Sequence, residues 1–209
     1  MFPMAMLAAM LCAGAAQAAT LELRVRDAAG SPVADAAVYA VPASGPLDAR
    51  HPRPVAIEQV DREFVPYLTV VQTNTAVSFP NRDPIQHHVY SFSAAKTFEI
   101  KLYTGNSPEI VLDRPGVITL GCNIHDWMIA YVVVVPTPHF GRTDASGTAT
   151  LRDVPGGSYE VRAFHPNQRA AAQPQTVALE ATAAATVAFV VDTTPRKPRY
   201  KPPQDRPRY

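Results

Sequence analysis

Residues 117–135 read VITLGCNIHDWMIAYVVVV. Two apolar segments, 116–122 and 129–135, flank a short polar loop, which is typical of two β-strands joined by a turn. The second segment is continuously apolar rather than alternating, so we expect a strand buried on both faces. The loop between the strands contains Cys122, His125 and Met128 at the spacing Cys-x2-His-x2-Met.

This loop places three metal-binding residue types within seven residues. A thiolate and imidazoles suit copper, and a weakly bound thioether is the usual further donor of a blue-copper site. Zinc rarely uses methionine. The loop is too short to supply a second imidazole, so we expect that group to come from another strand. The segment PIQHHVYSF, residues 84–92, offers His87 and His88.

The composition predicts an exported all-β protein. Of the 209 residues 47% are hydrophobic and only 18% are charged, and the 21 prolines divide the apolar residues into short runs. Residues 1–19 are apolar and end in small residues, which predicts a signal peptide; an uncleaved anchor is the alternative. Cys122 is then the one remaining cysteine, so no intramolecular disulfide forms and the thiol needs another role.

Two segments near the ends of the chain share a β pattern. Residues 20–45 alternate apolar and polar positions around a turn, which predicts a β-hairpin, and residues 141–166 repeat the pattern. From Thr193 onward the sequence is rich in proline and carries six Lys or Arg against Asp205. This composition predicts a disordered basic tail. The rest of the chain is mildly acidic and has no basic stripe, so nucleic acid is not expected as a partner.

The middle of the chain resembles a cupredoxin, the family of plastocyanin, azurin, pseudoazurin and amicyanin. The resemblance rests on the loop spacing, which is that of amicyanin, and on three upstream motifs: F-x-P at 64–66, V-x-F-x-N-x-D at 77–83 and H-x-V at 87–89. The chain as a whole resembles exported proteins labelled methylamine-utilisation or plastocyanin-like. The resemblance implies a Greek-key β-sandwich that binds one copper ion as Cu(I) or Cu(II).

The same resemblance implies the ligand set His87, Cys122, His125 and Met128. His88 stands where the family usually has asparagine. Adjacent residues on a strand point to opposite faces, so only one of the two histidines reaches the metal, and we favour His87. Backbone amides near the sulfur, from Asn81 or Asn123, are the expected hydrogen-bond donors to it.

The resemblance also implies that His125 is the electron exit. In cupredoxins the loop histidine reaches the surface through an apolar patch, for which Trp127 and Pro136 are the candidates here. The alternative is that Trp127 simply packs the loop. Asp126 stands where amicyanin-like loops often carry proline.

The terminal segments resemble the two halves of a carboxypeptidase-regulatory-like, transthyretin-like β-sandwich. The matching motifs are D-x-x-G-x-P-V at 27–33 and TDxxGxxxLxxVPxGxYxVxAxHP at 143–166. We therefore expect the cupredoxin domain to be inserted in the second sandwich; a tandem arrangement is the competing layout. The expected division is 1–19 signal peptide, 20–55 and 138–192 split sandwich, 56–137 cupredoxin domain and 193–209 tail.

These features predict a periplasmic blue copper protein that carries single electrons between redox proteins of unknown identity, and not an enzyme. A copper-binding module for storage, sensing or delivery is the first alternative. A structural β-sandwich that has lost its metal is the second. Membrane contact is expected only through the basic tail.

Overall fold

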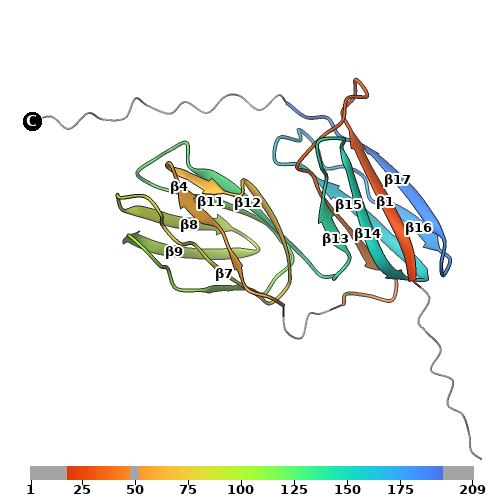
Figure 1. The fold of residues 1–209 in the computed structure, drawn as a ribbon, viewed down its shortest axis with the longest axis horizontal. Coiled ribbons are helices and arrows are strands. Elements are labelled where there is room, and N and C mark those ends of the chain that lie inside the picture. Colours follow the sequence, from red (N-terminus) through yellow and green to blue (C-terminus); the bar gives the residue numbers. More distant parts are fainter. Residues whose placement is uncertain (1–17, 48–51, 195–209) are drawn as a thin grey trace, which may run out of the picture.

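The computed structural model describes residues 18–47 and 52–194, and these residues form an all-β protein. Figure 1 shows two side-by-side groups of strands. Strands from both ends of the described chain form one group, and strands from the middle form the other. Among the described residues, no helix is long and apolar enough to cross a membrane.

The terminal group consists of two facing sheets. A three-stranded sheet has the order β14-β1-β17, and a four-stranded sheet has the order β13-β2-β15-β16. Their inward residues form one apolar core, which includes Leu21, Leu23, Val38 and Val161. The strands are β1 (Ala18–Arg26), β2 (Ala37–Pro42), β13 (Phe140–Arg142), β14 (Thr148–Pro155), β15 (Gly157–Phe164), β16 (Gln175–Leu179) and β17 (Ala184–Val190).

The middle group contains a five-stranded sheet with the order β6-β12-β11-β8-β9, a three-stranded sheet with the order β10-β7-β3, and the small hairpin β4-β5. The strands are β3 (Val55–Ala56), β4 (Glu58–Val60), β5 (Glu63–Val65), β6 (Leu68–Gln72), β7 (Thr75–Ser78), β8 (His87–Ser93), β9 (Lys96–Tyr103), β10 (Ile110–Leu112), β11 (Gly116–Gly121) and β12 (Ile129–Val135).

The two groups share an apolar contact. One face of β12 packs in the core of the middle group, with Ala130, Val132 and Val134 buried. Val133 and Val135 on the other face belong to a separate apolar cluster with Ala37, Leu68 and aromatic residues of both groups. This arrangement confirms the expected burial of β12 on both faces, and it explains the unbroken apolar run.

The predicted hairpin in residues 20–45 is wrong. β1 and β2 lie in different sheets: β1 pairs with β14 and β17, and β2 pairs with β13 and β15. The turn itself exists, because the N–H of Asp27 donates to the Ser31 carbonyl at 2.9 Å. Both neighbours of β1 come from the far end of the sequence, so local spacing could not reveal its partners.

The first strand overlaps the end of the predicted signal segment 1–19. β1 begins at Ala18, before the predicted end of the signal segment, and Ala19 is already buried in the core. Residues 1–17 of that segment and 195–209 of the predicted tail lie outside the described residues. The Thr194 N–H still donates to the Asn167 carbonyl at 3.0 Å. The division into domains and the transthyretin-like relationship stay predictions.

Candidate metal centre

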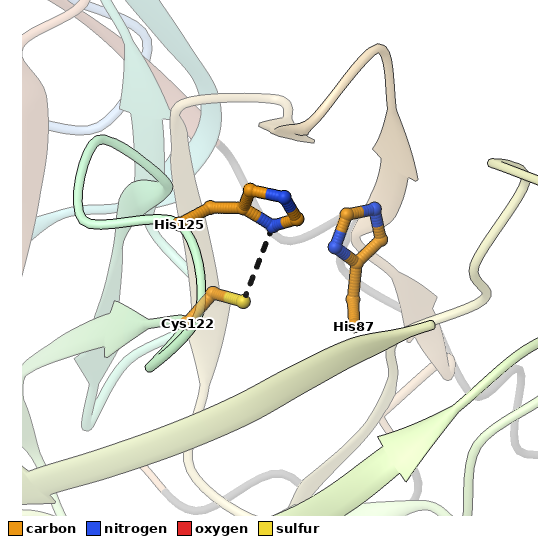
Figure 2. A group of neighbouring side chains, drawn as sticks. All are labelled: His87, Cys122 and His125. Atoms are coloured by element: carbon orange, nitrogen blue, oxygen red, sulfur yellow. Dashed lines mark hydrogen bonds between the residues drawn. The ribbon is translucent and has the colours of Figure 1, made fainter. Parts of the chain in front are cut away.

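The fold brings together His87, Cys122 and His125, one donor atom from each lying within 4.8 Å of the others. His87 is the first residue of β8, Cys122 follows β11, and His125 lies in the loop that leads to β12. β8 and β11 are neighbours in the sheet, with Gly121 opposite Tyr90. The sheet therefore delivers an imidazole from a distant segment to the cysteine, and Figure 2 shows the three side chains facing one another.

His87 is completely buried and is held by a carboxylate. Its Nε2 lies 2.7 Å from Oδ2 of Asp83. Because an ionised carboxylate only accepts hydrogen bonds, the proton belongs to Nε2. Nδ1 is buried and has no hydrogen-bond partner among the described residues. The nitrogen left for a metal is therefore Nδ1.

Asp83 is in turn fixed by backbone donors. The N–H groups of Asp61 and Arg62 donate to its two oxygens at 2.7 and 2.9 Å. Burial opposes ionisation of Asp83, but the hydrogen bonds from Arg62, His87 and Asp61 outweigh it and hold the pKa of the carboxyl below its usual value. Asp83 is thus an anion at neutral pH.

Cys122 lies in a setting that favours its thiolate. Burial alone would raise the pKa of the thiol, yet interaction with His87 and the backbone N–H groups of His88 and Ile124 lowers the pKa below its ordinary value. Burial likewise opposes the charged form of His87, but its contacts with Cys122 and Asp83 raise the pKa of the imidazole.

The backbone N–H groups that stabilise the sulfur belong to His88 and Ile124, whereas Asn81 and Asn123 were the expected donors. The N–H of Asn81 donates to the Gly105 carbonyl instead, at 2.7 Å. The Asn81 side chain fixes the loop ahead of His87, because its Nδ2 donates to the carbonyls of Ile85 and Tyr103 at 2.8 and 2.9 Å. Asn81 therefore shapes the approach to the site rather than contacting the sulfur.

His125 is the least buried of the three residues. Its Nδ1 lies 3.8 Å from Sγ of Cys122, and its ring centre lies 4.9 Å from that of His87. Burial, together with the neighbouring charges of His87 and Arg62, lowers the pKa of His125, so its imidazole is neutral and able to bind a metal.

Met128 closes the loop and is completely buried. Its backbone N–H donates to the His125 carbonyl at 2.9 Å, and its side chain belongs to the same apolar cluster as Cys122. Met128 therefore lies in the buried cluster at the base of the loop that carries Cys122 and His125. Its role as a ligand stays a prediction.

His88 is directed to a different partner. Its Nε2 lies 2.8 Å from Oε1 of Glu99 on the neighbouring strand β9, and it does not belong to the group formed by His87, Cys122 and His125. The two adjacent histidines thus each bond one carboxylate, in different surroundings.

Of the two residues expected in an apolar patch, only Trp127 lies beside His125, with ring centres 5.1 Å apart. Pro136 follows β12, whose seven residues span about 23 Å, and so lies at the other end of that strand. The inclusion of Pro136 was therefore wrong. Trp127 is tied to the hairpin by a hydrogen bond from its Nε1 to the Arg62 carbonyl at 3.2 Å.

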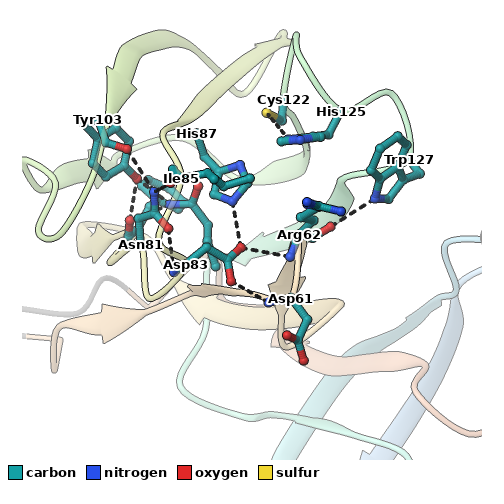
Figure 3. Close-up of polar contacts among 12 residues, drawn as sticks. Asp61, Arg62, Asn81, Asp83, Ile85, His87, Tyr103, Cys122, His125 and Trp127 are labelled. Carbon is teal, nitrogen blue, oxygen red and sulfur yellow. Dashed lines mark hydrogen bonds and ion pairs between the residues drawn. The ribbon is translucent and has the colours of Figure 1, made fainter. Parts of the chain in front are cut away.

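The roles of Asp83 and Arg62 have no signal in the sequence. Asp83 belongs to the V-x-F-x-N-x-D motif, and its position four residues before His87 does not reveal the contact, because that contact depends on the loop fixed by Asn81. Figure 3 shows these polar contacts around the site.

These residues fit a copper ion. The group offers two imidazole nitrogens and a sulfur within 4.8 Å, and a buried Nδ1 of His87 that is otherwise without a partner. An unpaired buried nitrogen costs free energy, which a metal bond would offset. The softness of the donor set favours copper over magnesium, calcium or manganese.

No family model matches the chain, and no curated protein matches it. Similar solved structures include the copper-containing nitrite reductase NirK from Thermus scotoductus SA-01, at 20% identity over 44% of this chain and 25% of that chain, with a TM-score of 0.38. The chain thus spans a quarter of the length of that reductase. A purple cupredoxin from Nitrosopumilus maritimus is 20% identical over 39% of this chain and 98% of its own, with a TM-score of 0.34. A variant of amicyanin is 16% identical over 46% and 98%, with a TM-score of 0.37.

Proposed function

We propose that the chain is an exported copper protein that carries single electrons between redox partners. The observation that carries this proposal is the group of His87, Cys122 and His125, which joins buried donors to one partly exposed imidazole. Together with Met128 these residues would hold one copper ion, which supplies one-electron chemistry between Cu(II) and Cu(I).

The surrounding residues suit this role. Asp83 keeps the proton of His87 on Nε2 and leaves Nδ1 free to bind. The N–H groups of His88 and Ile124 stabilise the sulfur of Cys122 as a thiolate. Because strands and buried hydrogen bonds fix these groups in advance, little rearrangement is needed when the charge at the site changes.

Electron exchange is proposed to occur through His125. This imidazole combines contact with the site and partial exposure, whereas His87 and Cys122 are buried. Outer-sphere transfer of an electron needs no room for a substrate, so we propose no chemical conversion at this site. The apolar segment 1–19 supports export to the periplasm.

Titration of the purified metal-free protein with Cu(II) tests the proposal. We expect one copper ion per chain by native mass spectrometry, an intense visible band from thiolate-to-copper charge transfer, and reversible one-electron voltammetry. Tight binding of Cu(I) without a stable coloured Cu(II) form would instead favour storage or delivery of copper. Failure to retain copper would contradict both functions.

A further inference from the structure

The turn between β4 and β5 lies between the two segments that carry the imidazoles. On one side, the N–H groups of Asp61 and Arg62 donate to the carboxylate of Asp83, and the oxygen that accepts from Arg62 also accepts from Nε2 of His87. On the other side, the carbonyl of Arg62 accepts from the indole of Trp127. Figure 3 shows this turn reaching both sides of the site.

These contacts form a continuous connection. It runs from His87 through Asp83 and the Arg62 peptide to Trp127, whose ring lies 5.1 Å from that of His125 at an angle of 56°. The connection is made entirely by protein groups and needs no metal. It therefore ties the two histidine-bearing segments to one common element.

The turn adopts a backbone conformation that its residues do not favour. Asp61 and Arg62 have φ angles of 53° and 59°. Two-residue hairpin turns with positive φ at both positions prefer asparagine and glycine. Residues other than glycine are found in this region at some cost in free energy, and they persist where the surrounding structure determines them. Here the conformation directs two successive N–H groups to one carboxylate.

We propose that the β4–β5 turn and Asp83 form a clamp that orients both imidazoles before copper binds and that tunes the reduction potential of the site. Asp83 is a positioning residue in this scheme. Its negative charge acts on the metal through His87 and favours Cu(II) over Cu(I). Trp127 is the second anchor of the clamp, on the side of His125. The effect on the reduction potential rests on the proposed function, whereas the orientation of the side chains does not depend on it.

The first test compares Asp83→Asn with Glu99→Gln. Both variants neutralise a carboxylate that lies 2.7 or 2.8 Å from a histidine Nε2. Asparagine cannot accept all three hydrogen bonds, because its amide nitrogen only donates. For copper-loaded Asp83→Asn we expect at least a tenfold shift of the affinity ratio toward Cu(I), equivalent to a rise of 59 mV in the reduction potential. Glu99→Gln should shift the ratio less than twofold. Equal shifts in the two variants would overturn the clamp.

The second test needs no copper. Trp127 is the single tryptophan of the chain, so its indole N–H gives one assignable NMR signal. In the metal-free protein we expect this proton to be protected from exchange with solvent, and at least tenfold less protected in Asp83→Asn than in Glu99→Gln. Unchanged protection in Asp83→Asn would show that the turn does not connect the two sides, and the clamp would be wrong even if copper binds.

Trp127→Phe tests the other end of the clamp, and it replaces Asp83→Asn as the test if that variant does not fold. It keeps an aromatic ring beside His125 but removes the donor to Arg62. We expect the electron paramagnetic resonance spectrum of the copper-loaded variant to differ from that of the wild-type protein. In the metal-free variant we expect the amide proton of Arg62 to exchange with solvent faster, as followed by its NMR signal. If neither changes, the Trp127 anchor is refuted. Absence of the visible band in the wild-type protein would refute the proposed function instead, and the exchange data would still decide the clamp.

Discussion

The indole Nε1–H of Trp127 donates a hydrogen bond to the carbonyl oxygen of Arg62, 3.2 Å away. The two residues are 65 positions apart in sequence, and the bond fastens the loop that carries Cys122, His125 and Met128 to the β4–β5 hairpin. The bond holds the loop in place, as the packing role of Trp127 requires, and a docking role for this half-buried side chain stays a prediction. The charge of Arg62 acts on the imidazole of His125, and Figure 3 shows Arg62 between His87 and Trp127.

Replacement of Cys122 by serine should abolish the visible charge-transfer band, because the band requires a thiolate bound to copper. Met128→Leu should keep the band and shift the reduction potential, since a distant thioether tunes the balance between Cu(I) and Cu(II) without creating the colour. Absorption spectra and voltammetry of the copper-loaded variants check both outcomes. A Cys122→Ser protein that remains intensely coloured would refute the proposed ligand set.

His87→Ala and His88→Ala should differ sharply in copper binding. His87 lies in the group with Cys122 and His125, whereas His88 bonds Glu99. We expect His87→Ala to weaken copper binding at least tenfold and to lose the band, because even the loss of a group that supports a metal ligand costs this much affinity. We expect His88→Ala to keep the band and to bind copper within about twofold of the wild-type protein. Competition titration against a chelator measures the affinities. If His88→Ala lost the colour and His87→Ala kept it, the assignment of His87 as the ligand would be refuted.

Neutralising Arg62 should lower the reduction potential. A positive charge near His125 disfavours Cu(II), so Arg62→Gln relieves this repulsion while leaving the backbone contacts of the turn in place. Because the side chain is open to solvent screening, we expect a fall of less than about 59 mV, or less than tenfold in the affinity ratio. Arg152→Gln is the matched control. Arg152 is an exposed residue of β14 in the terminal group of strands, so its replacement should not change the reduction potential. A rise in Arg62→Gln would contradict this assignment.

Leu68→Ala should destabilise the metal-free protein by about 2–5 kcal/mol, the usual range for deleting a fully buried leucine side chain. Leu68 is 1% exposed and belongs to the cluster shared by β12 and the terminal group of strands. Urea unfolding measures the change. Phe92→Ala is the control, because Phe92 is 78% exposed and its removal should cost less than about 1 kcal/mol. Similar losses in the two variants would mean that the shared cluster contributes little.

His139 should make stability depend on pH. Burial lowers the pKa of His139 in the folded protein, so the unfolded chain binds its proton more readily. Its contribution to stability is present above the ordinary histidine pKa of about 6.5 and is lost as the pH falls through the lower folded pKa. We therefore expect the loss of unfolding free energy between about pH 8 and about pH 5 to be smaller in His139→Gln than in the wild-type protein. An equal or larger loss in His139→Gln would contradict the sign.

Much of the secondary structure could be predicted because periodicity reports which side chains are buried. The continuous apolar run of β12 correctly indicated burial on both faces. The pattern of residues 20–45 identified two strands, but their assignment to one hairpin was wrong, since β1 pairs with strands more than a hundred residues away. Local alternation shows that a face is covered and does not show by which strand.

The sequence by itself determined the donor types and their order in the loop, because Cys122, His125 and Met128 are close along the chain whatever the rest does. Only the tertiary structure decided that His87 rather than His88 joins Cys122 and His125, and that Asp83, Arg62 and Trp127 surround them. The physical reason is that these contacts depend on the twist and register of neighbouring strands and on backbone donors in a distant turn. Backbone N–H groups are present at every residue except proline, so no residue type announces them in advance.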